Sequence, residues 1–124
     1  MNIAIIGTGY VGLVTGTCFA EIGHNVICVD CDEAKVKLLQ DGGIPIFEPG
    51  LEEMVEKNVA EGRLNFTAST AEGVEKSDVI FIAVPTPPLD DGSVDLSFIE
   101  RVARDIADAM TSYKVVVDKS TVPV

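Results

Sequence analysis

Short runs of apolar residues alternate along this chain with longer segments in which apolar residues recur every three or four positions. Runs such as Asn2–Ile6 and Asp78–Val84 are apolar almost throughout, which is typical of strands in a parallel sheet covered on both faces. Segments such as Leu96–Met110 have the spacing of helices that bury one side. The pattern predicts strands at Asn2–Ile6, Asn25–Val29, Leu64–Thr67, Asp78–Val84 and Val115–Val117, and helices at Tyr10–Ile22, Glu33–Gln40, Leu51–Ala60, Thr70–Lys76 and Leu96–Met110.

The alternation of predicted strands and helices indicates an α/β protein, because parallel neighbours in a sheet need a crossover connection that is usually a helix. We expect residues 1–124 to form one doubly wound parallel sheet with helices on both faces and a strand order of 3-2-1-4-5. The last strand, at Val115–Val117, would lie at an edge of that sheet. Because an unpaired apolar edge favours pairing with other chains, we expect self-association.

Capping residues mark several predicted helix ends. Asp32 stands directly before Glu33–Gln40 as a candidate N-cap, and Gly42 follows that helix as a stop signal. Ser97 and Glu100 have the spacing of a capping box at the start of the last helix.

The charge of the chain narrows the kinds of partner that it can bind. Its 124 residues are 47% apolar and carry a formal net charge of −11, so we expect a globular core and no broad binding to nucleic acid or anionic membranes. The N-terminal region lacks the basic start of a signal peptide, and no uninterrupted apolar run approaches the length of a membrane span. We therefore expect a cytoplasmic protein. Because its net charge is negative, we expect local backbone groups, rather than a basic patch, to hold any phosphate ligand.

The cysteines do not have the spacing of a complete metal site. Cys28 and Cys31 form a single C-x-x-C pair, Cys18 stands apart, and His24 is the only histidine. A zinc site needs four ligands, and an odd number of cysteines without a signal sequence favours reduced thiols. We expect no metal site, and we expect Cys28, inside an apolar run, to be a core residue.

Three glycines, Gly7, Gly9 and Gly12, follow the first predicted strand directly. This G-x-G-x-x-G pattern stands between a strand and a helix, and Asp30 ends the second predicted strand. The context is that of a Rossmann dinucleotide-binding fingerprint, in which the first glycine makes the tight turn, the second lets the backbone approach a pyrophosphate, and the third lets helix and strand pack closely.

This arrangement predicts how an acidic protein can hold a dianionic cofactor. The N-terminus of the helix offers free N–H groups and a positive dipole to the phosphates. Asp30 would accept hydrogen bonds from the hydroxyls of the adenosine ribose. A 2′-phosphate would meet the same carboxylate, so we expect the cofactor to be NAD rather than NADP.

Several motifs occur in one order along the chain: GTGYVGL, the acidic Asp30, IPIFEPGL, PTP and KSTVPV. Together they resemble the N-terminal part of the UDP-glucose/GDP-mannose dehydrogenase family, most closely its bacterial UDP-glucose 6-dehydrogenases, over essentially the whole chain. The resemblance implies an NAD-dependent oxidation of the C6 alcohol of UDP-glucose to the carboxylate of UDP-glucuronate, with two NAD.

The resemblance also implies that the residues matching Val11, Asp30, Lys35, Thr86 and Thr121 contact the cofactor. From the residues alone, the Lys35 side chain either reaches the ribose or belongs to a solvated helix face. Thr86 and Thr121 each follow a predicted strand, where such folds bind ligands, although hydroxyls at such positions also serve as loop or capping groups.

Three further residues near these motifs have more than one interpretation. Tyr10, within the glycine turn, either packs over the pyrophosphate or starts the helix. Glu48, in the FEPG segment, is interpreted as part of a turn before the next helix. Pro85 stands where many relatives have glycine, and because proline lacks a backbone N–H, it puts a backbone contact to the cofactor in question.

The resemblance places the family's catalytic machinery outside this chain. Its cysteine nucleophile and supporting lysine, asparagine and acidic residues come from later in the family sequence, so we expect no catalytic residue here. The chain is expected to be a truncated NAD-binding domain that lacks the central helix and the C-terminal domain for the UDP-sugar substrate. It would bind NAD without catalysing the reaction, and the enzyme would be a homodimer or a higher homo-oligomer.

Two alternatives stay open on the sequence. The domain could belong to a GDP-mannose or UDP-N-acetylmannosamine dehydrogenase, a choice that depends on the missing substrate domain. It could instead be a stand-alone NAD-sensing regulatory module, although the EPGL and KSTVPV segments favour the dehydrogenase.

Overall fold

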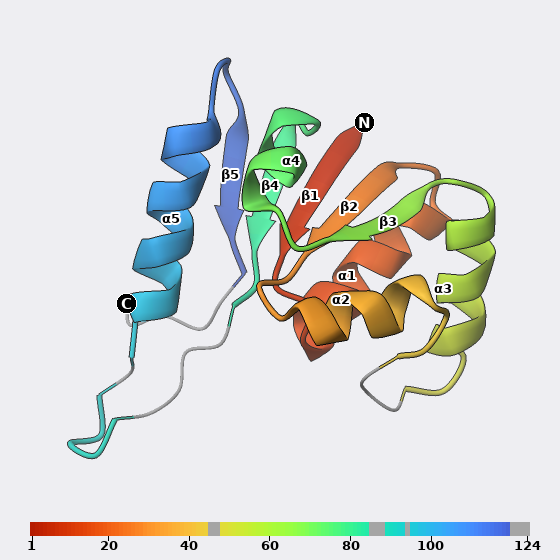
Figure 1. The fold of residues 1–124 in the computed structure, drawn as a ribbon, viewed down its shortest axis with the longest axis horizontal. Helices are drawn as coiled ribbons and strands as arrows, with labels where there is room; N and C mark the ends of the chain where they lie inside the picture. Colours follow the sequence, from red (N-terminus) through yellow and green to blue (C-terminus); the bar gives the residue numbers. More distant parts are fainter. Residues whose placement is uncertain (45–47, 85–88, 94, 120–124) are drawn as a thin grey trace.

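The computed structural model describes residues 1–44, 48–84, 89–93 and 95–119, and within them five strands form one parallel sheet (Figure 1). The order is β3-β2-β1-β4-β5, and every neighbouring pair is parallel. Both the predicted fold class and the predicted strand order are therefore confirmed. The strands are β1 Asn2–Ile6, β2 Asn25–Val29, β3 Leu64–Thr67, β4 Val79–Ile82 and β5 Val115–Asp118.

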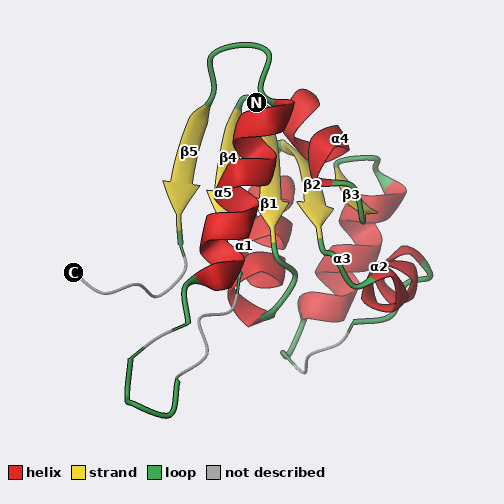
Figure 2. Cartoon of the chain, turned by 60° about the vertical axis from the view of Figure 1, so that its left-hand side comes forward, coloured by secondary structure: helices red, strands yellow, loops and turns green. Residues whose placement is uncertain are grey.

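Helices cover both faces of this sheet, three on one side and two on the other (Figure 2). The alternation of side chains along β1 builds two separate cores, because Ile3 and Ile5 point to one face while Ala4 and Ile6 point to the other. α1, α2 and α3 pack on the first face, and α4 and α5 on the second. The helices are α1 Tyr10–Glu21, α2 Glu33–Gln40, α3 Leu51–Ala60, α4 Thr70–Glu75 and α5 Ser97–Ala109.

Helix caps agree with the sequence at α2 and differ at α5. Asp32 is the N-cap of α2, where its carboxylate accepts hydrogen bonds from the N–H groups of Ala34 and Lys35. The capping box predicted at Ser97 and Glu100 is wrong, because Ser97 is already helical and its N–H donates to the Asp95 carboxylate at 2.9 Å. The Asp95 carboxylate thus accepts from the N–H that the Glu100 carboxylate would have bound in a capping box.

β5 lies at the edge of the described sheet, paired with β4 on one side only. Its residues Val115 and Val117 are in register with Val79 and Phe81 of β4, so these four side chains share one face. α1 covers this face at Phe81, where the Phe19 and Phe81 rings lie 5.2 Å apart. Val115, farther out, is 44% exposed, which confirms an apolar edge where the sequence predicted one.

Cys28 is fully buried in the core of the first face, as predicted, and burial raises the pKa of its thiol to about 12. Cys18 and Cys31 are exposed, and all three thiols are free. Within the described part of the chain, no group of three or more potential metal ligands is gathered. None of the helices described has the length and apolarity needed to cross a bilayer.

Candidate cofactor site

A cleft of about 710 Å³ opens where the carboxyl ends of β1, β2 and β4 meet. The hydrogen-bond ladder keeps these ends level: Gly7 N–H donates to the Val29 carbonyl at 2.7 Å, and Ala83 N–H to the Ile6 carbonyl at 2.8 Å. Ligands bind at this edge in doubly wound sheets. Six residues predicted or implied to bind the cofactor line the cleft or its floor: Gly7, Gly9, Tyr10, Val11, Asp30 and Lys35.

Gly7 and Gly12 are required by the packing of the turn itself. Gly7 has a φ of +108°, and a Cβ atom there would overlap the Ala83 carbonyl of the strand next to it. A Cβ atom on Gly12 would overlap the Gly7 carbonyl oxygen. Gly12 is buried beneath the turn and does not line the cleft. These two glycines therefore allow β1, β4 and α1 to pack close together.

Gly9 differs, because a Cβ atom there would meet no atom of the described residues within 4 Å. It is the N-cap residue of α1, and no side chain caps the first turn of this helix. The first turn of α1 also contains no acidic residue. Unpaired N–H groups and the positive end of the helix dipole thus lie beside the cleft, where an anionic group such as a pyrophosphate fits.

Asp30 lies at the end of β2 and is surrounded by hydrogen-bond donors. Its Oδ2 accepts from the Thr8 hydroxyl at 2.6 Å and from the Thr8 N–H at 3.1 Å. Its Oδ1 accepts from the Asp32 N–H at 2.9 Å. Lys35 Nζ lies 3.6 Å from Oδ2, so the lysine is paired with the carboxylate and is not simply on a solvated helix face.

These donors determine the protonation state of Asp30. Burial of the side chain would by itself raise its pKa, but the hydrogen bonds from Thr8 and Asp32 and the charge of Lys35 outweigh burial and lower the pKa below its usual range. A carboxylate that is largely buried and still ionised is suited to accepting hydrogen bonds from hydroxyl groups.

Tyr10 and Val11 form the outer rim of the glycine turn, with exposed fractions of 55% and 46%. Tyr10 is the first residue of α1, and its hydroxyl faces Glu48. The hydrogen bond to the Glu48 carboxylate and its negative charge raise the pKa of Tyr10. Glu48, interpreted from the sequence as part of a turn, therefore also touches the rim of the cleft.

Some lining residues were missed by the sequence analysis. Thr8, between the first two glycines, is 1% exposed and binds Asp30 directly; a hydroxyl beside the end of β2 was the available signal. The far wall of the cleft is formed by residues of α5. Their spacing along one face of this helix was the signal in the sequence that could have indicated them. That wall consists of Phe98, Arg101, Val102 and Asp105, and Lys119 after β5 completes it.

Thr86 and Thr121, implied by the resemblance to contact the cofactor, lie outside the described residues, as does Pro85. The predicted contacts at these positions therefore stay predictions. The last described residues before these two segments, Val84 and Lys119, do line the cleft.

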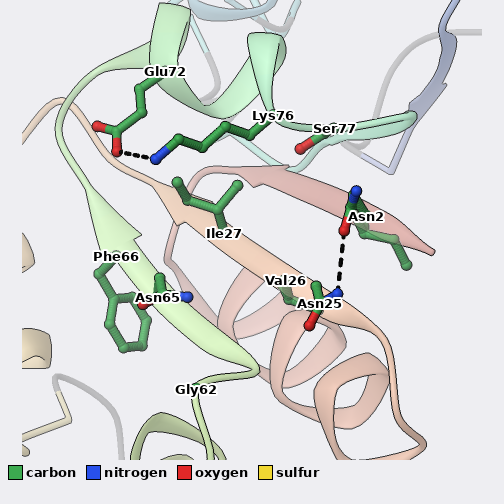
Figure 3. Close-up of a pocket in the computed structure, with 11 residues that line it drawn as sticks. Asn2, Asn25, Val26, Ile27, Gly62, Asn65, Phe66, Glu72, Lys76 and Ser77 are labelled. Atoms are coloured by element: carbon green, nitrogen blue, oxygen red, sulfur yellow. Dashed lines mark hydrogen bonds and ion pairs between the residues drawn. The ribbon is translucent and has the colours of Figure 1, made fainter.

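A second depression, of about 410 Å³, lies toward the amino ends of β1, β2 and β3, away from the cleft (Figure 3). Its polar groups mostly bind one another: Asn25 Nδ2 donates to Asn2 Oδ1 at 3.2 Å, and Lys76 Nζ pairs with Glu72 Oε1 at 3.0 Å. The Ser77 hydroxyl is buried there and has no hydrogen-bond partner among the described residues. No residue of the glycine turn reaches this depression, so the cleft at the carboxyl ends is the candidate cofactor site.

Comparison with known sequences agrees with this geometry. The sequence model of the UDP-glucose/GDP-mannose dehydrogenase family, NAD binding domain, matches residues 1–124. The chain belongs to the UDP-glucose/GDP-mannose dehydrogenase family. The enzymes of this family use NAD, and the resemblance inferred from the motifs is therefore confirmed.

Two similar members of the family are bacterial enzymes. The chain is 54% identical to the UDP-glucose 6-dehydrogenase TuaD of Bacillus subtilis over 99% of its own length and 27% of that protein. It is 57% identical to the UDP-glucose 6-dehydrogenase of Rhizobium meliloti over its whole length and 29% of that protein. The chain thus spans less than a third of these relatives.

A solved family structure has the same fold. A ternary complex of the GDP-mannose dehydrogenase from Pseudomonas aeruginosa superposes with a TM-score of 0.95 at 42% identity, over 98% of this chain and 29% of that one. The sheet and its two helical layers are therefore those of the family's NAD-binding domain.

Proposed function

We propose that this chain binds NAD in the cleft at the carboxyl ends of β1, β2 and β4. The observation that carries the proposal is that one cleft joins the uncapped N-terminus of α1 to the ionised, donor-surrounded Asp30. The pyrophosphate would lie at Gly9 and the first N–H groups of α1, and the adenosine ribose at Asp30 and Lys35. Tyr10 and Val11 would cover the pyrophosphate from the rim.

The same geometry supports a preference for NAD over NADP. The side chain of Asp30 is only 12% exposed and keeps its charge, so a 2′-phosphate would bring two further negative charges against a carboxylate that cannot move away. Lys35 offers one compensating charge, but it is already paired with Asp30.

In the longer protein, the chain would be the cofactor half of an enzyme that oxidises UDP-glucose to UDP-glucuronate with two NAD. Identities of 54% and 57% to UDP-glucose 6-dehydrogenases, against 42% to the GDP-mannose enzyme, support this substrate. Since the chain spans 27% and 29% of those relatives, the catalytic cysteine, the central helix and the UDP-sugar domain would follow it. We place the enzyme in the cytoplasm as a homodimer or higher homo-oligomer.

Calorimetric titration of the 124-residue chain with NAD and NADP tests the proposal. We expect NAD to bind more tightly than NADP, and Asp30→Asn to weaken NAD binding about tenfold or more, because charge-assisted hydrogen bonds to the ribose are lost. The matched control is Asp108→Asn, which removes one charge from an exposed position on α5 away from the cleft.

Three results would contradict parts of this proposal. A folded wild-type chain that binds neither nucleotide would exclude the cleft as a self-sufficient NAD site. Equal weakening by both variants would show that total charge, rather than Asp30, governs binding. Formation of NADH from UDP-glucose by this chain alone would contradict the placement of the catalytic residues outside it.

A further inference from the structure

Thr8 binds the Asp30 carboxylate with two groups of a single residue. Its hydroxyl lies 2.6 Å and its N–H 3.1 Å from Asp30 Oδ2. Thr8 is 1% exposed, and among the described contacts its hydroxyl has no other hydrogen-bond partner. A buried hydroxyl that left Asp30 would lose its bond without gaining one to water, so the pair is expected to persist when the cleft is filled.

The two oxygens of Asp30 are therefore unequal. A carboxylate oxygen has about two lone-pair sites, and Oδ2 receives both Thr8 donors with Lys35 Nζ at 3.6 Å. Within the described part of the chain, Oδ1 receives only the Asp32 N–H, at 2.9 Å. One acceptor site therefore remains on Oδ1. The other oxygen of the same carboxylate, Oδ2, is held in place by Thr8.

We propose that Thr8 is a positioning residue, which anchors Oδ2 of Asp30 so that Oδ1 is presented to a hydroxyl of the adenosine ribose. This inference rests on the proposed binding of NAD in the cleft. Thr8 is also part of the glycine turn, and so it ties the ribose end of the site to the pyrophosphate end. A carboxylate without this anchor would rotate and lose a defined orientation toward the ribose.

The anchor also has a consequence for pH. The Thr8 bonds help to hold the pKa of Asp30 below its usual range, together with the Asp32 N–H and the Lys35 charge. NAD binding that needs the ionised carboxylate is then kept until the pH falls through that lowered pKa. Loss of the Thr8 hydroxyl raises the pKa of Asp30, so binding is lost at a higher pH.

The test compares Thr8→Val, which removes the hydroxyl at nearly constant volume, with Thr8→Ser, which retains it. Thr17→Val is the matched control, since Thr17 is a second buried threonine whose hydroxyl donates only to the Leu13 carbonyl of its own helix at 2.7 Å. NAD affinity is measured by calorimetry as a function of pH, and the Asp30 carboxyl carbon is titrated by NMR without nucleotide.

We expect Thr8→Val to weaken NAD binding about five- to tenfold, because the Asp30 carboxylate then has no fixed orientation toward the ribose. The same variant should shift both the acid limb of binding and the Asp30 titration to higher pH. Thr8→Ser and Thr17→Val should stay within about twofold of wild type, with an unshifted Asp30 titration. A purely packing role for Thr8 would not move the titration.

An unchanged Asp30 titration in folded Thr8→Val would overturn the inference, and so would NAD binding as tight as or tighter than wild type. If Thr8→Val does not fold, the hydroxyl proton of Thr8 in the wild-type chain decides: its bond to Asp30 must persist when NAD is added. A wild-type chain that binds no NAD contradicts the proposed function, whereas the titration in its nucleotide-free form still shows whether Thr8 holds the carboxylate.

Discussion

At the scale of single residues, the three glycines of the turn have different physical roles although the sequence motif treats them alike. Gly7 and Gly12 are enclosed by backbone, and any Cβ atom there would overlap a carbonyl oxygen. A Cβ atom on Gly9 would have no atom of the residues that the structure describes within 4 Å, and the φ of Gly9 is −73°, which any residue can adopt. Close packing of the turn therefore requires glycine at positions 7 and 12, whereas at Gly9 the requirement that we expect is space for the ligand.

This difference predicts opposite results for two alanine variants. Gly12→Ala should lower the free energy of unfolding by about 1–3 kcal/mol or more, because a methyl group is forced into packed backbone. Gly9→Ala should leave stability unchanged or raise it by about 0.4–1 kcal/mol, because the unfolded chain loses freedom. Gly9→Ala should nevertheless weaken NAD binding, since the added methyl group occupies the place of the pyrophosphate.

Urea denaturation and calorimetric titration of the two variants measure these effects separately. The assignment fails if Gly9→Ala is the less stable protein, or if it binds NAD as tightly as wild type while remaining folded.

At the scale of elements, α1 and α3 are joined by a polar network around Asn58, which is fully buried. Asn58 Nδ2 donates to Glu21 Oε2 at 2.8 Å, and its Oδ1 accepts from the Arg63 guanidinium at 3.0 Å. Arg63 Nε in turn donates to the Ala20 carbonyl at 2.9 Å. The network closes the C-terminal ends of both helices, and it leaves Lys57 on the surface, paired with Glu21.

Asn58→Leu should therefore destabilise the fold by about 1–3 kcal/mol, because the partners at Glu21 and Arg63 lose a buried hydrogen-bonding group. Lys57→Leu, one residue away, should change stability by about 0–1 kcal/mol, because it removes only a surface ion pair. Chemical denaturation of both variants measures the contrast. Equal effects of the two substitutions would show that the buried Asn58 amide contributes no more to stability than the surface ion pair of Lys57.

The stability difference between wild type and Asn58→Leu should also depend on pH. Hydrogen bonds from Lys57 and Asn58 lower the pKa of Glu21 below its ordinary value. The stabilisation from Glu21 is therefore present above the pKa of the unfolded chain and is lost as pH falls through the lowered folded value. The stability difference between wild type and Asn58→Leu should shrink when the measurement is repeated in acid.

The elements show what the sequence could and could not predict. Apolar runs and helical spacing predicted every described strand and helix, because each element buries its own periodic face. Ala103 and Ala107 of α5 have the helical spacing that predicts burial but are exposed. What the sequence did not show depends on contacts between elements: Asp95 at the start of α5, the cleft wall on α5, and Thr8 on Asp30.

At the scale of the whole molecule, the apolar edge at β5 favours association between chains, and the negative charge of the chain opposes it. β5 exposes apolar side chains on both faces of the sheet edge, because Val115 and Val116 point to opposite faces and are each 44% exposed. β5 has a strand on only one side within the described sheet, and such edges favour pairing between chains. The net charge of −11 opposes association, because two copies repel each other.

This balance predicts that the chain self-associates and that salt strengthens the association. Raising the ionic strength shortens the Debye length from about 30 Å at 0.01 M to about 8 Å at 0.15 M, so repulsion weakens while apolar contact at β5 does not. Val115→Glu should reduce the association, because it places a charge on the edge. Ile22→Glu is the matched control, since it removes an apolar side chain that is 71% exposed at the end of α1 and adds the same charge. Light scattering across a salt series measures the mass of the particles in solution. The prediction is contradicted if the chain stays a monomer at every salt concentration, or if Val115→Glu and Ile22→Glu reduce association equally.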